Sequence, residues 1–226
     1  MKKMSANAPD EFEKTLSYER FNRYLGWAGG DRQLAIELYT LNAKLSESLF
    51  TPLHMLEVAL RNRIYTVLSE SVHDHWFDEA EYQKGLRQAE QLAKAKADLA
   101  EENKDSAPDR VVAALTFGYW TAFFGADYEE VWRKNLHKIA QHPEGTPLRR
   151  KNFSSPLTPI RALRNRIAHH EPILAWNLPK HYGHIIELTE WLSPSAAEWS
   201  RNHSRFLDVY PVERVALHTS DNAADD

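Results

Sequence analysis

Apolar side chains recur every three or four residues along most of the chain, which is the spacing that places them on one face of an α-helix. The clearest of these stripes contains five aliphatic residues in a row at this spacing, Leu53, Leu56, Leu60, Ile64 and Val67. Strands would instead show strict alternation of apolar and polar residues, and no stretch stands out in this way. The pattern therefore predicts an all-α, bundle-like domain.

Capping residues and prolines divide the first half of the chain into predicted helices. Asp31 is positioned to cap a helix that runs to Leu49. Thr51 and Pro52 are expected to open the next helix, because proline is favoured at the first helical position. Residues 78–104 are rich in Ala, Gln, Glu and Lys, which predicts a long and exposed helix there.

The second half of the chain continues the helical pattern. An apolar helix is expected over residues 111–124, where Gly118 would allow a close helix crossing. Asp127 with Glu130 predicts a capping box for the helix that follows. Residues 142–157 contain Pro, Gly and several basic side chains, so we expect a basic loop there.

The length of the chain, 226 residues, and its composition predict a single domain with a tail at each end. We expect residues 1–15 to be loose and unlike a signal peptide, residues 16–209 to form a single all-helical domain, and residues 210–226 to form a polar, acidic tail. The chain contains no cysteine, which excludes disulfides and thiolate metal sites. No apolar run approaches the ~18 residues needed to span a membrane. We therefore expect no membrane association and a cytoplasmic location.

The candidate chemistry lies in a helix that is expected to be capped by Thr158 and to stop near His170. Asn165 and His169 are four residues apart and share a face, so the amide can orient the imidazole. Arg164 and His169 are five apart, roughly 140° round the helix. A site that uses both therefore needs a cleft alongside the helix, or a second copy of it.

This pair of residue types suits cleavage of a phosphodiester without a metal. The arginine guanidinium is a permanent cation whose donors match phosphate oxygens. Histidine takes up and returns a proton near neutral pH. With an RNA substrate, the 2′-OH would be the nucleophile, His169 the acid or base, and Arg164 the group that stabilises charge on the phosphate.

Basic residues cluster around this helix although the net charge of the chain is −4. Residues 145–170 include no acidic side chain. Apart from Arg164, the basic residues of this segment form either a track for RNA phosphates or, with equal weight, a solvated loop and helix face. They are Arg149, Arg150, Lys151, Arg161 and Arg166.

An earlier helix repeats part of the motif, since residues 59–64 and 162–167 are identical. Only the second copy is followed by histidine, so catalysis is assigned to it. Glu57 and Arg61, on the helix that carries the first copy, are expected to pair and, together with His170, to support the site. The alternative is purely structural: Arg164 pairs with a carboxylate such as Glu57, and His169 lies satisfied in the core.

A metal site is the rival form of catalysis. His169, His170, His181 and His184 are close in the sequence, and the last two are spaced to share a helix face. A repeated Glu-x-x-His pair and a His-Glu-x-x-His motif are both absent. We therefore expect neither a metal nor another cofactor.

The residues Arg164, Asn165 and His169 resemble the Arg-Asn-three-residues-His signature of the HEPN superfamily of helical ribonucleases. Wider similarity to the Abi (abortive infection) proteins of bacteria covers roughly residues 18–192. It is carried by four segments, residues 56–62, 115–120, 128–132 and 164–170.

This resemblance implies a HEPN-like helical bundle with additional helices. It implies a metal-independent endoribonuclease that acts in phage defence or as a toxin and leaves 2′,3′-cyclic phosphate ends. It also implies a homodimer in which His169 of each chain lines one cleft. Two alternatives stay open: an RNA-binding module that works with a small regulatory RNA, and an interaction partner of an antitoxin that makes contact through residues 78–104.

Overall fold

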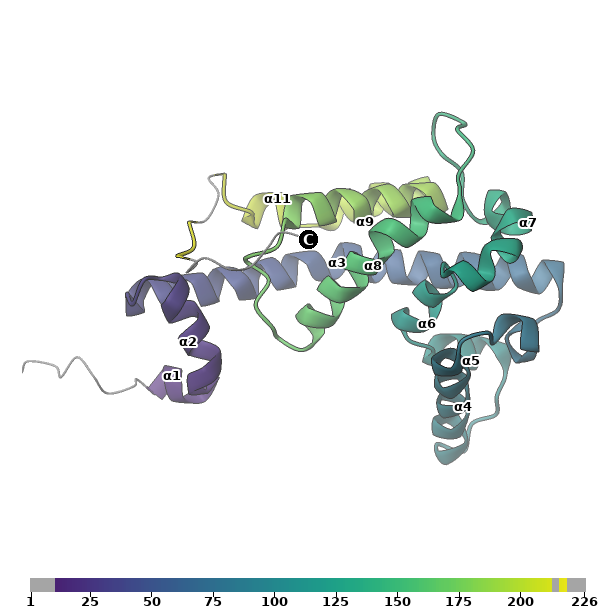
Figure 1. Ribbon diagram of the computed structural model, residues 1–226, viewed down its shortest axis with the longest axis horizontal. Helices are drawn as coiled ribbons and strands as arrows, with labels where there is room; N and C mark the ends of the chain where they lie inside the picture. The colour runs from purple at the N-terminus through teal and green to yellow at the C-terminus, as the bar shows by residue number, and fades with distance from the viewer. Residues whose placement is uncertain (1–10, 213–215, 219–226) are drawn as a thin grey trace, which may run out of the picture.

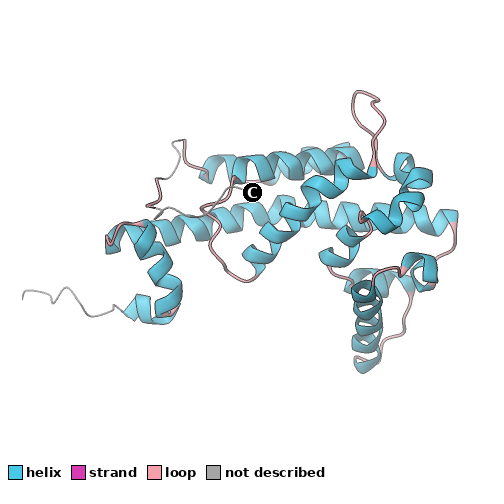
Figure 2. Ribbon diagram, in the orientation of Figure 1, coloured by secondary structure: helices cyan, strands magenta, loops and turns pink. Residues whose placement is uncertain are grey.

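The computed structural model describes residues 11–212 and 216–218 of the chain. Within these ranges the regular structure is entirely helical, which confirms the predicted all-α bundle (Figure 2). No helix of the described residues is long and apolar enough to cross a membrane. Residues 1–10, 213–215 and 219–226 of the two predicted tails lie outside the described ranges.

Helix α3, Arg32–Ser71, is 40 residues long and runs along most of the length of the molecule (Figure 1). Asp31 caps it as predicted, because its side chain accepts a hydrogen bond from the backbone N–H of Leu34 at 3.1 Å. The predicted break at Thr51 and Pro52 is wrong, since the helix continues through a buried Pro52. A proline inside a helix removes one hydrogen bond. Burial of the apolar stripe on both sides of Pro52 outweighs that loss.

The other helices pack around α3. Helices α2, α9, α10 and α11 all contact it directly, and α8 crosses it obliquely in Figure 1. Residues 11–16, predicted to be mostly loose, instead form α1, in which Glu13 is buried and paired with Arg32. The bounds of these helices are α1 Glu11–Leu16, α2 Tyr18–Trp27, α8 Arg150–Ala168, α9 Leu178–Leu192, α10 Pro194–His203 and α11 Phe206–Val209.

The segment after α3 differs most from the prediction. Instead of one long exposed helix over residues 78–104, it contains two 3₁₀ turns and then α4, one face of which is buried against α5 and α6. The predicted helix over residues 111–124 is two helices, because Thr116 caps the second with a hydrogen bond from the Tyr119 N–H. The bounds are Trp76–Asp78 and Ala80–Tyr82 for the 3₁₀ turns, α4 Leu86–Glu101, α5 Pro108–Ala114 and α6 Phe117–Ala122.

Three local predictions in this region are also wrong. A Cβ atom at Gly118 would meet the Thr116 hydroxyl at an ordinary 3.5 Å, so the glycine is not required for a close helix crossing. The predicted capping box is absent, because α7, Glu129–Ile139, follows a 3₁₀ turn and has Tyr128 as its N-cap. Helix α8 already begins at Arg150, so the predicted basic loop is shorter.

The early start of α8 has a local cause. The Asn152 side chain accepts a hydrogen bond from the backbone N–H of Arg149 at 2.7 Å, which stabilises the first turn. Phe153 and Leu157 are buried, so the apolar stripe of the helix begins well before the motif. Thr158 is therefore an internal residue rather than the predicted cap, and its hydroxyl donates to the Ser154 carbonyl.

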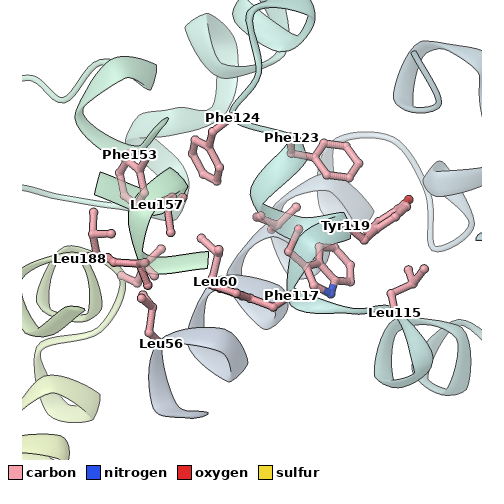
Figure 3. Close-up of a cluster of buried hydrophobic side chains, with 14 of the residues drawn as sticks. Leu56, Leu60, Leu115, Phe117, Tyr119, Phe123, Phe124, Phe153, Leu157 and Leu188 are labelled. Carbon is pink, nitrogen blue, oxygen red and sulfur yellow. The ribbon is translucent and has the colours of Figure 1, made fainter. Parts of the chain in front are cut away.

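The core lies where α3, α6, α8 and α9 meet. Figure 3 shows Leu56 and Leu60 of α3 among the aromatic rings of α6 and the apolar side chains of α8 and α9. The Phe124 and Phe153 rings stack with centroids 4.9 Å apart. These aromatic residues are buried, as their helical spacing predicts, and the stacked rings hold α8 against the segment that follows α6.

We predict that Leu60→Ala lowers the free energy of unfolding by about 2–5 kcal/mol, because it opens a cavity in the middle of this core. Leu60 is fully buried. Urea denaturation measures the change. Thr66→Ala, an exposed position on the same helix, is the control and should stay within about 0.5 kcal/mol of wild type. A Leu60→Ala protein as stable as wild type would show that the α3 stripe does not hold the bundle together.

Candidate functional site

The motif lies at the C-terminal end of α8, which stops at Ala168, close to the predicted position. His169 caps the helix, and its backbone N–H donates to the Asn165 carbonyl at 2.9 Å. His170 has a φ of 56°, in the left-handed region that ends many helices. The following N–H, that of Glu171, reaches back to the Arg166 carbonyl at 2.8 Å and closes the turn.

Helix α3 fixes the chain just beyond this turn. The buried Asn42 side chain accepts a hydrogen bond from the backbone N–H of Ile173 at 2.7 Å. Because both groups are buried, leaving either one unpaired would be costly. The path of the chain after the motif is therefore set by a residue of α3 that is distant in sequence.

Arg166 stabilises the same turn. Its Nε donates to the Pro172 carbonyl at 3.1 Å, and its Nη1 lies 3.3 Å from the Glu171 carboxylate. The guanidinium also lies over the Trp176 ring, 5.7 Å from the centroid. Three contacts thus hold a side chain that the sequence assigned to RNA binding, and Arg166 serves to fix the shape of the turn.

Arg164 contacts α3 through an ion pair. Its Nε lies 3.5 Å from Oε2 of Glu57, and the two side chains are 38% and 23% exposed. The spacing predicts that Glu57 pairs with Arg61, but Glu57 pairs with Arg164 instead. The Nε of Arg61 donates to the side chain of Asn62. The pair agrees with the structural alternative, but its exposure leaves the guanidinium accessible to a ligand.

The imidazole of His169 is exposed, so the alternative in which it lies in the core is wrong. Asn165 is exposed too, and the hydrogen bond that joins the two residues runs between backbone atoms. The end of α8 therefore presents one accessible arginine and one accessible histidine. An arginine and a histidine are residue types that can act in metal-free phosphodiester cleavage.

The predicted phosphate track is divided by the structure. Arg150 is only 10% exposed, because its guanidinium binds the Glu129 carboxylate and the Phe124 carbonyl. Arg149 and Lys151 are exposed at the start of α8. Arg161 lies nearer the motif and lines a pocket of about 340 Å³ that is also lined by Ser154, Ser155 and Thr158.

A larger groove of about 1060 Å³ lies beside the end of α8. His170 lines it together with residues from α3, α10 and α11. Sequence analysis identified only His170 among these residues. The others missed include Lys44, Phe50, His203 and Arg205, which come from helices far apart in the sequence. The sequence contains only a weak signal for these groove residues, because an aromatic residue lies four positions before a histidine at Phe50 and again at Trp199.

The remaining histidine pair lies on α9. His181 is buried and its ring packs against Trp176, with centroids 5.4 Å apart. Burial lowers the pKa of His181, and the positive charges of His184 and Lys180 lower it further. Within residues 11–212 and 216–218, no cluster of three His, Asp or Glu side chains is arranged to hold a metal ion.

The pKa of His181 predicts a pH-dependent stability. The unfolded chain binds a proton at His181 near its ordinary pKa of about 6.5, whereas the folded chain binds it only at lower pH. The contribution of neutral His181 to the free energy of unfolding is therefore fully present above about pH 6.5, and it is lost as the pH drops towards the lowered pKa. Urea midpoints at about pH 7.5 and about pH 5 should differ less in His181→Gln than in wild type. His137→Gln, at an exposed position of α7, is the control, and equal pH dependence in all three proteins would contradict the assignment.

Comparison with known proteins identifies one family. The family model described as Abi-like protein matches residues 10–177, which is most of the chain and includes α3, α8 and the whole motif. A search of curated proteins found no significant match, and neither did a search of solved structures.

Proposed function

The chain belongs to the Abi-like protein family, and on this premise we propose that it is a metal-independent endoribonuclease of the HEPN type. Membership of the family supports a function of the abortive-infection type. The ribonuclease mechanism is our own inference from the end of α8. The observation that supports it is the exposure of Arg164 and His169 on a helix end that α3 holds in place.

In the proposed reaction the RNA itself supplies the nucleophile. The 2′-oxygen bonds to phosphorus, and the bond between phosphorus and the 5′-oxygen breaks. One histidine takes the proton of the 2′-OH, and a second, protonated histidine donates a proton to the departing 5′-oxygen. Arg164 stabilises the extra negative charge on the phosphate, and Glu57 holds the guanidinium in position through Nε. The products are a 2′,3′-cyclic phosphate and a 5′-hydroxyl.

We further propose that two copies of the chain form the complete site. The reaction needs one proton acceptor and one donor, and a single motif supplies His169 with His170 beside it in a different backbone conformation. A homodimer with two α8 ends facing each other would place His169 of both protomers in one cleft. Arg149, Lys151 and Arg161 would then hold the RNA strand on either side.

The test is incubation of purified protein with mixed cellular RNA in the presence of EDTA. We predict that wild type cleaves the RNA and leaves 2′,3′-cyclic phosphate ends. His169→Ala should lose activity by a factor of about 10² or more, the range typical of a general acid or base. His137→Ala is the matched control, because it removes an exposed histidine from α7 and should leave activity unchanged. Equal cleavage by wild type and His169→Ala would reject this site.

A second candidate function is an RNA-binding module, alone or with a small regulatory RNA. The ion pair between Arg164 and Glu57 favours it, because a paired arginine can hold a phosphate without taking part in cleavage. RNA that binds equally to wild type and His169→Ala, and stays intact with both, would favour this function. The antitoxin-partner alternative would use the exposed face of α4, which is shorter than the predicted contact helix.

The dimer makes a separate prediction. Light scattering at near-physiological salt should give a mass of twice the 26.1 kDa of one chain. A single protomer mass at concentrations where the protein cleaves RNA would overturn the two-copy site. It would leave the role of His169 to be tested by the cleavage assay alone.

A further inference from the structure

The groove beside the motif is a large feature of the described surface that the proposed mechanism does not use. Its volume is about 1060 Å³. One wall is the first half of α3, a second contains Ile167, Ala168 and His170 at the end of α8, and a third comes from α10 and α11. His170, which lines the groove, directly follows the proposed catalytic histidine, His169, in the chain.

One exposed aromatic side chain lines this groove, and a second stacks on a residue that lines it. Phe50 of α3 lines it and is 64% exposed, and its ring stacks on the imidazole of His54 with an interplanar angle of 8°. On α10, Trp199 is 42% exposed and stacks on His203, which also lines the groove. Flat apolar rings that remain in water offer the stacking surface that an unpaired nucleobase needs.

The charges around the groove match a phosphate backbone. Arg20, Lys44 and Arg205 line it, together with the two carboxylates of Glu47 and Asp208. Glu47 lies 3.7 Å from Arg205, but both side chains are about 70% exposed, and such pairs are weak and readily exchanged. His170 and His203 add two groups that become cationic when protonated. Positive side chains therefore outnumber negative ones along the groove.

We propose that this groove binds single-stranded RNA and leads the strand to His169. An unpaired base stacks on Phe50, and the adjoining phosphates lie along Lys44 and Arg205. The choice of RNA over other polyanions rests on the function proposed above. The choice of a single strand does not, because bases in a duplex have no free face to stack on an aromatic ring.

The proposal is tested by fluorescence anisotropy, which measures the affinity for a labelled, unstructured RNA. A length of about 12 nucleotides suits a groove of this kind. The titrations use His169→Ala protein, so that cleavage does not alter the probe. Adding Phe50→Ala should weaken binding roughly tenfold, whereas Phe50→Trp should retain it. Leu86→Ala is the control: this side chain is 79% exposed on α4 and remote from the groove.

The cations make an independent prediction. Lys44→Ala combined with Arg205→Ala should weaken binding and make the slope of log K against log salt shallower by about one to two, because fewer counterions are released. A duplex of the same sequence should bind more weakly and should not respond to Phe50→Ala. Equal sensitivity of duplex and single strand to Phe50→Ala would overturn the stacking contact.

The outcomes separate this inference from the proposed function. Wild-type protein that cleaves RNA while the Phe50 and Lys44 variants bind normally would overturn the groove and leave the ribonuclease intact. Binding that depends on Phe50, with RNA left uncut by wild type, would support the groove and overturn the ribonuclease. If Phe50→Ala instead converts a dimer to a monomer and each chain still binds RNA equally well, the groove is an interface between copies and the inference fails.

Discussion

Burial of a single apolar stripe along α3 is the interaction on which the rest of the structure depends. A helix of 40 residues cannot cover its own apolar face, so other helices must pack along its length. Helices α9, α10 and α11 cover one part of it, and α6 and α7 cover another. The stripe is continuous enough to carry the helix through Pro52, although a proline normally ends or kinks a helix.

The same helix places the candidate site. Asn42 holds the loop after α8 through the Ile173 N–H, and Glu57 holds Arg164 on α8 itself. Arg166 then closes the turn between these two points. An exposed histidine at a helix end would otherwise move freely, whereas here the backbone on both sides of His169 is fixed. A catalytic group needs this kind of support to keep its geometry.

Periodicity in the sequence predicted the fold class and the aromatic core, because these depend on local spacing, and Pro172 predicted the end of α8 near His170. It was wrong at Pro52 and at Thr116, where tertiary burial and a local cap competed with the pattern and prevailed. The assignment of Arg150 and Arg166 to an RNA track stays a prediction, and a count of charges does not show that both guanidinium groups also contact nearby carbonyls and carboxylates. The groove could not be predicted, since the helices that form it meet only in the folded chain.

The central claim is that the end of α8 cleaves RNA through its own 2′-OH. The most direct measurement uses an RNA oligonucleotide that the wild-type protein cuts at one mapped position, compared with the same oligonucleotide lacking only the 2′-OH at that position. The account predicts that the substituted strand stays intact and still binds with unchanged affinity. Cleavage of the substituted strand at the same position would show that water or another nucleophile attacks, and would contradict the mechanism assigned to Arg164 and His169.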